Sequence, residues 1–246
     1  MTGIVTAVLF CFASALQAGI AKRINYRGVS YDLYIVHPRK DDIRFFWKDE
    51  DGDLFASFGA VRRWLRKKGR KLLFATNGGI FEWGLQPLGL YIENRRVKVK
   101  PNYRKGKGNF YLQPNGVFYV NRHHAGVMTM RAYRKLRPKA HFATQSGPML
   151  VLNRRIHPIF RRRSNSRYIR NGVGIDRYGR IIFAISNRPV NFYTFSSLFK
   201  HRLHCINALY LDGNISRMYL PQKKRHDLGG NFAVIIGVSK PFAAKK

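Results

Sequence analysis

The chain has 246 residues, of which 46 are Lys or Arg and only 12 are Asp or Glu, so its formal net charge is +34. Hydrophobic residues make up 45% of it, with abundant Phe and Tyr, which supports one sizeable folded domain and excludes an intrinsically disordered chain. A charge this positive favours anionic partners, and the shortage of acids leaves few candidates for chemistry that needs a carboxylate.

The N-terminal residues 1–21 have the composition of an export signal. Residues 2–16 carry no charge and are mostly apolar, and small residues suited to cleavage follow at Ala18 and Ala21. The apolar stretch is shorter than the roughly 20 residues of a membrane-spanning helix. We therefore expect a cleaved signal peptide, a mature domain over residues 22–246 that is periplasmic or secreted, and no transmembrane anchor. The alternatives are an uncleaved anchor and an apolar N-terminal strand.

The rest of the chain is predicted to form many short strands and about two helices. Apolar residues recur at helical spacing over residues 54–65 and again over residues 195–203, the second with Thr194 as its N-cap. Turn residues between apolar runs predict hairpins over residues 88–100, 109–120, 149–156 and 172–186. Further strands are predicted over residues 45–47, 71–76, 209–211 and 232–238. Strands that do not alternate regularly with helices predict a single α+β domain with a mixed or antiparallel sheet.

Two sequence positions directly after predicted buried strands are candidates for a site. Asn77 is followed by Gly78 and Gly79, which let the backbone approach a ligand and present consecutive N–H groups to an oxyanion, although a tight turn is the alternative. Asp212 and Gly213 end a second strand, where an acid is well placed for catalysis, although Asp-Gly is also a common turn.

Two further charged residues have features expected of a site. Glu82 lies beside Trp83 and Leu85, whose apolar surface is expected to raise the pKa of its carboxyl by desolvation; the alternative is a solvated loop acid. Arg170 ends a basic run over residues 161–170 and begins a predicted strand, and a guanidinium held there suits bidentate binding of phosphate.

Other chemistries find no support in the sequence. Ser146 has no Asp or His in catalytic order, which argues against a serine hydrolase. His123 and His124 lack a partner at metal-binding spacing, so no metal site is predicted. The sequence does not identify a cofactor.

Seven short motifs, in order along the chain, together resemble the bacterial phosphodiester glycosidase family. They are NGGIFE (77–82), PLGL (87–90), GNF (108–110), PNGVF (114–118), QSGPML (145–150), RNGVG (170–174) and LYLDG (209–213). This family is related to the catalytic domain of the lysosomal uncovering enzyme, which removes N-acetylglucosamine from a sugar phosphodiester. The chain departs from many members at Asn214, where they have glycine.

The resemblance implies a hydrolase that cleaves a sugar, such as an N-acetylhexosamine, from a 1-phosphodiester linkage in a phosphate-containing glycan or glycolipid, and the predicted signal peptide implies that it is exported. An ordinary glycosidase uses two carboxylates, but a phosphate leaving group needs little protonation, so one carboxylate and cations on the phosphate suffice. We expect Asp212 to act as nucleophile or base, with Glu82 as its partner and Arg170 on the phosphate. The other residues expected to line the site are Asn77, Gly78, Gly79, Gln145, Ser146, Asn171 and Gly213.

A second hypothesis, of a different class, is a non-catalytic binder of polyanions, either an anionic envelope polymer or nucleic acid. The net charge supports it, whereas the lack of any nucleic-acid-binding motif argues against nucleic acid as a specific partner. The position of Asp212, Glu82 and Arg170 distinguishes the two hypotheses, because an enzyme needs them in one cleft and a binder needs only a continuous basic face.

Overall fold

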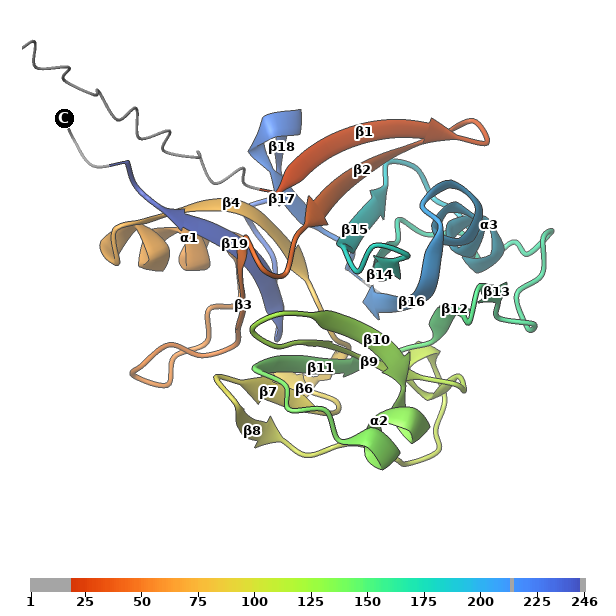
Figure 1. Ribbon diagram of the computed structural model, residues 1–246, viewed down its shortest axis with the longest axis horizontal. Helices are drawn as coiled ribbons and strands as arrows, with labels where there is room; N and C mark the ends of the chain where they lie inside the picture. Colours follow the sequence, from red (N-terminus) through yellow and green to blue (C-terminus); the bar gives the residue numbers. More distant parts are fainter. Residues whose placement is uncertain (1–18, 213–214, 244–246) are drawn as a thin grey trace, which may run out of the picture.

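The computed structural model describes residues 19–212 and 215–243, so most of the predicted signal peptide, residues 1–18, and Gly213 lie outside the described residues. Three antiparallel sheets make up most of the domain, and a two-stranded ribbon is added to them (Figure 1). Every strand pair among the described residues is antiparallel. The domain is mostly sheet with three short α-helices in this part of the chain, so the α+β class fits only loosely.

The strand order defines the sheets. The seven-stranded sheet runs β1 (Ile20–Tyr26), β2 (Val29–Val36), β15 (Ile181–Ser186), β14 (Asn171–Asp176), β16 (Cys205–Asp212), β12 (Met149–Leu152), β13 (Arg155–Ile156). The first five-stranded sheet runs β18 (Arg225–His226), β17 (Met218–Leu220), β4 (Arg70–Asn77), β19 (Ile235–Pro241), β3 (Asp42–Phe46). The second runs β10 (Ala125–Thr129), β9 (Gly116–Val120), β11 (Phe142–Ser146), β7 (Tyr91–Glu93), β8 (Arg96–Val99), and the ribbon pairs β5 (Phe81–Glu82) with β6 (Gln86–Pro87).

The helices are α1 (Phe58–Lys67), α2 (Met130–Leu136) and α3 (Phe192–Ser197), the last continuing into a π-helical turn over Leu198–Arg202. Helix α1 matches the first predicted helix but begins after Ser57, whose side chain accepts a hydrogen bond from the N–H of Ala60. The second predicted helix begins earlier than expected, because Asn191 rather than Thr194 is the N-cap and accepts from the N–H of Thr194 at 2.9 Å. Within residues 19–212 and 215–243, no helix has the length and apolar composition needed to cross a membrane.

Three of the four predicted hairpins are confirmed, as β7–β8, β12–β13 and β14–β15. The hairpin predicted over residues 109–120 is wrong. Residues Asn109–Tyr111 form a short 3₁₀ turn, and β9 is flanked by β10 on one edge and by β11 on the other. Because both edges of β9 are occupied, no ladder is available to the segment before it.

The three sheets meet in one aromatic core. Phe183 of β15 packs against Phe74 of β4, with ring centroids 4.9 Å apart, and against Phe118 of β9 at 5.7 Å. Phe74 in turn stacks on Tyr34 of β2 at 4.5 Å. Burial of these large side chains packs β4, β9 and β15 against one another. The packing brings the end of β4 close to the ends of β14 and β16.

The N-terminal strand bears on where the signal ends. Ile20 pairs with Ile35 and Ala21 with Tyr34, so β1 already includes two residues of the predicted 1–21 signal. Cleavage after Ala18 leaves β1 intact, whereas cleavage after Ala21 removes its first two residues.

Candidate active site

Three polar side chains from three strand ends meet between the seven-stranded sheet and the sheet that contains β4. Asp212 is the last residue of β16, Asn171 is the first residue of β14 directly opposite it, and Asn77 ends β4. The Asn77 amide Nδ2 donates to Asp212 Oδ2 at 2.7 Å. Asp212 is 4% exposed and both asparagines are 1% exposed, so this hydrogen bond forms away from bulk water.

The Asn77 amide is itself fixed by its other contacts. Its Oδ1 accepts from the backbone N–H of Arg217 at 2.9 Å and from Asn171 Nδ2 at 3.1 Å, and its Nδ2 also donates to the carbonyl of Ile215. Ser216 Oγ donates to Asn171 Oδ1 at 3.2 Å and so extends the network. Because Oδ1 accepts from an N–H, the amide nitrogen must face the carboxylate, and Asp212 is held in a single orientation.

Two other polar residues predicted for the site, Ser146 and Gln145, form hydrogen bonds to backbone groups. Ser146, at the end of β11, donates to the carbonyl of Leu211 at 2.8 Å and ties the third sheet to the strand that carries Asp212. Gln145 Oε1 accepts from the N–H groups of Leu90 and Asn102, and its Nε2 donates to the Asn102 carbonyl at 2.6 Å. Gln145 therefore joins two loop segments to each other.

The glycines after Asn77 serve packing. The N–H of Gly78 donates to the Val234 carbonyl at 2.9 Å, so it is not directed at a ligand as expected. A Cβ at Gly78 would lie 2.5 Å from the Ile236 side chain. Gly79 has a φ of +83°, and a Cβ there would lie 2.4 Å from Thr144 Oγ1. Both positions require glycine for a tight turn against neighbouring strands.

Glu82 occupies the solvated environment that was the alternative for it, and not the desolvated one. It lies in β5 and is exposed, and the side chain of Trp83 beside it is 99% exposed, so the expected desolvation is absent. Glu82 lines a cleft with β6 and residues 99–104. Asp212 instead contacts Asn77 of β4, pairs with Asn171 of β14 and accepts at its carbonyl from Ser216 Oγ at 3.3 Å.

Arg170 is also placed differently from the prediction. It is 1% exposed, and its guanidinium donates to the Val190 carbonyl at 2.8 Å and to the Ser166 carbonyl and Tyr210 hydroxyl, both at 3.1 Å. The Phe192 ring covers it at 3.7 Å. Desolvation lowers the pKa of Arg170 despite the opposing effect of Tyr210. This guanidinium anchors the basic loop before it and is not accessible to a phosphate.

A cleft of about 620 Å³ reaches the hydrogen-bond network of Asp212 at Ser216, which donates to Asn171. Ser216 and Arg217 line it, and Arg217 is exposed. Asp227 also lines this cleft, and its Oδ2 accepts from the N–H of Met218 at 3.1 Å and from Arg225 Nε at 2.9 Å. Tyr168 adds a half-exposed aromatic ring. Sequence reasoning gave these residues no role, although Asp227 is one of only three acids after Glu93.

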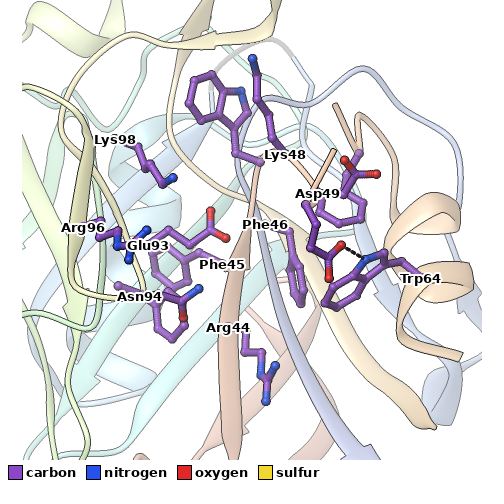
Figure 2. A pocket seen from close by; sticks show the side chains of 14 residues that line it. Arg44, Phe45, Phe46, Lys48, Asp49, Trp64, Glu93, Asn94, Arg96 and Lys98 are labelled. Atoms are coloured by element: carbon purple, nitrogen blue, oxygen red, sulfur yellow. Dashed lines mark hydrogen bonds between the residues drawn. The ribbon is translucent and has the colours of Figure 1, made fainter. Parts of the chain in front are cut away.

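A second cleft, of about 530 Å³, gathers both charge signs around aromatic rings (Figure 2). The three carboxylates among its described lining residues already have partners. Glu50 accepts from Trp64 Nε1 at 2.8 Å and pairs with Lys68 at 3.0 Å, and Glu93 accepts from the Tyr91 hydroxyl at 2.6 Å. Asp49 accepts from two backbone N–H groups of its own turn. Burial raises the pKa of Glu93. These contacts fix the walls of the cleft and leave Asp212 as the better candidate for catalysis.

A model of the phosphodiester glycosidase family matches residues 70–239, which include the Asp212 cluster and the cleft beside it. The chain belongs to this family. Its sequence is 39% identical to that of the uncharacterized protein YigE of Escherichia coli (strain K12) over 196 residues, 78% of this chain and 75% of YigE.

Solved structures share the fold. The catalytic domain of zebrafish N-acetylglucosamine-1-phosphodiester alpha-N-acetylglucosaminidase, auto-inhibited by its pro-peptide, matches with a TM-score of 0.60 and 15% identity over 89% of this chain and 81% of that one. A hypothetical protein from Synechocystis matches with a TM-score of 0.59 and 14% identity over 90% of this chain. The chain spans 61% of the length of the Synechocystis protein.

Proposed function

We propose that this protein is an exported hydrolase that cleaves a sugar, an N-acetylhexosamine, from a 1-phosphodiester linkage in a glycan or glycolipid. Membership of the phosphodiester glycosidase family supports the reaction class, and the activity in the name of the zebrafish fold relative suggests the sugar. The observation that carries the proposal is the buried Asp212 carboxylate, oriented by Asn77 at 2.7 Å, with a cleft lined by Ser216, whose hydroxyl donates to the Asp212 carbonyl at 3.3 Å.

In the proposed reaction the bond between C1 of the sugar and the bridging oxygen breaks. Its electron pair leaves with the phosphate, which becomes a phosphomonoester. Asp212 either takes the proton from a water that attacks C1 or attacks C1 itself; in the second case water then hydrolyses the glycosyl ester, which releases the sugar and restores the carboxylate. Because the second pKa of a phosphomonoester is about 6, the leaving group needs little help from a general acid.

The cleft suggests roles for three further residues. Arg217 follows Ser216, has its backbone fixed by Asn77 and projects an exposed guanidinium, so we assign it to the leaving phosphate in place of Arg170. Asp227 replaces Glu82 as the second carboxylate, and Arg225 keeps it oriented at 2.9 Å. Tyr168 offers an aromatic face to the sugar ring.

The test is incubation of the mature protein with UDP-GlcNAc and a panel of GlcNAc 1-phosphodiesters, with free sugar as the readout. In ¹⁸O-labelled water, cleavage at C1 puts the label into the sugar, whereas attack at phosphorus puts it into the phosphate. Label in the phosphate would refute a glycosidase mechanism.

Asp212→Asn preserves shape and removes the charge, so it should fold normally and lose turnover by at least about 10³-fold. Asp51→Asn is the matched control, because it removes one negative charge at an exposed position and should leave turnover unchanged. Wild type that binds anionic polymers but releases no sugar would favour the polyanion-binding hypothesis instead. Asp212→Asn with wild-type turnover would refute the catalytic role of Asp212.

A further inference from the structure

A cationic cavity of about 700 Å³ lies in the part of the molecule that holds β7, β8 and α2, at the lower end of Figure 1. Its wall is formed by the β7–β8 hairpin, the turn after β9 and the segment after α2. Four cations line it, at Arg95, Arg122, Arg137 and Lys139, and no Asp or Glu is among the described residues that do so. The volume lies within the range of about 300–1,000 Å³ that is usual for ligand pockets.

Two of these arginines occupy backbone conformations that other residue types adopt more easily. Arg95 has a φ of +67° in the β7–β8 turn, and Arg137 has a φ of +43° at the end of α2. Glycine or asparagine would be less strained at both positions. The structure thus keeps two long cationic side chains at the cavity where turn geometry alone would favour small ones.

The wall that carries Arg95 is ordered. The backbone N–H of Arg95 donates to the carbonyl of His141 at 2.9 Å, and its Nε donates to His141 Nδ1 at 3.3 Å. Desolvation lowers the pKa of His141, and nearby Arg95 and Arg122 lower it further, which favours the neutral imidazole. A neutral imidazole accepts from Arg95 without cancelling the positive charge of the cavity.

The remaining lining is apolar. Ile92, Tyr133 and Ala140 belong to a small buried core beneath the cavity. Val97, which lines the cavity, is 57% exposed, and Leu136, which directly precedes the lining residue Arg137 in the chain, is 64% exposed. A fully hydrated anion gains nothing from such apolar residues, whereas a ligand that joins an anionic group to hydrocarbon contacts both kinds of surface.

We infer that this cavity binds the headgroup of an anionic phospholipid, with Val97 and Leu136 reaching the adjoining acyl region, and so holds the protein at a membrane surface. Four cations attract the phosphate, and the exposed apolar residues contribute on insertion. This site goes beyond the proposed hydrolytic activity and does not depend on it.

The test is co-sedimentation of the purified protein with vesicles made of equal parts phosphatidylglycerol and phosphatidylcholine, against phosphatidylcholine alone, at about 0.15 M salt. Because a protein of such high net charge binds any anionic surface to some extent, the control must match charge. Arg122→Glu/Lys139→Glu should weaken binding by about 10-fold or more, whereas Arg62→Glu/Arg63→Glu on the exposed face of α1 should weaken it by less than about threefold. An equal loss in the two double variants would overturn the inference.

A third variant separates a lipid from a soluble phosphate. Val97→Ser keeps the charge and removes an apolar contact, so it should lower vesicle binding by about threefold. If glycerol 1-phosphate displaces the protein from vesicles and shifts the His141 imidazole resonances while Val97→Ser has no effect, the cavity recognises phosphate alone and the lipid inference is wrong. All these variants should hydrolyse soluble substrate as wild type does.

Discussion

Replacement of Arg170 by lysine distinguishes a structural guanidinium from one that binds substrate. The buried side chain donates to Val190, Ser166 and Tyr210 in three directions and stacks on Phe192. A lysine ammonium cannot reach all three acceptors from one point and loses the stacking of a planar group. It also places a more strongly hydrated cation in a site with 1% exposure.

Loss of one or two charge-assisted hydrogen bonds, at about 1.5–3 kcal/mol each, predicts that Arg170→Lys lowers the free energy of unfolding by about 3 kcal/mol. The measurement is urea unfolding followed by tryptophan fluorescence. Arg62→Lys, on the exposed face of α1, is the control and should change the free energy by less than about 0.5 kcal/mol. Unchanged stability together with a raised KM for phosphodiester substrates would refute this reasoning and would indicate that Arg170 binds the phosphate of the substrate.

Three further outcomes are expected. Intact-mass analysis of protein from the envelope fraction should show a chain that begins at Gly19, because β1 starts at Ile20; an unprocessed Met1 would contradict it. Binding to an anionic polymer should weaken as salt rises to about 0.15 M, where the screening length is about 8 Å, whereas hydrolysis of a small substrate with a neutral aglycone should change less; equal responses would mean that the field does not steer. Burial raises the pKa of Glu93 above 4.5, so its stabilising contribution is present below that pH and is lost as pH rises through the folded-state pKa. Glu93→Gln should therefore gain stability relative to wild type between pH 4 and pH 7 in urea unfolding, and a constant difference would argue against a buried carboxyl.

The strand ends of the site could be predicted from sequence because the signal is local. Apolar runs that end in Asn77 and in Asp212 predict buried strands followed by turns, and both form as β4 and β16. Asn171 directly precedes the hairpin predicted over residues 172–186, and the register of β14 places it opposite Asp212. What sequence could not supply is the packing of the two sheets that brings Asn77 to Asp212, which are 135 residues apart.

The errors concern which way a side chain points. Arg170 and Arg217 are both arginines beside predicted or observed strands, yet one is sealed under Phe192 and the other is exposed in a cleft. Glu82 follows the same strand as Asn77, but Trp83 extends into solvent and leaves it hydrated. Whether each side chain is buried depends on residues distant in sequence that pack over it. A local sequence pattern therefore cannot predict its burial.

The choice of partner for Asp212 bears on how such a basic protein can use a carboxylate. An amide donor such as Asn77 orients a carboxylate without cancelling its charge, whereas Arg225 holds Asp227 by an ion pair. If Arg217 binds the phosphate and Asp212 faces C1 of the sugar, the oxygen of the scissile bond lies near a positive charge and its carbon lies near a negative one. The excess of cations then favours departure of the phosphate, which is the end of the bond that gains negative charge as it breaks.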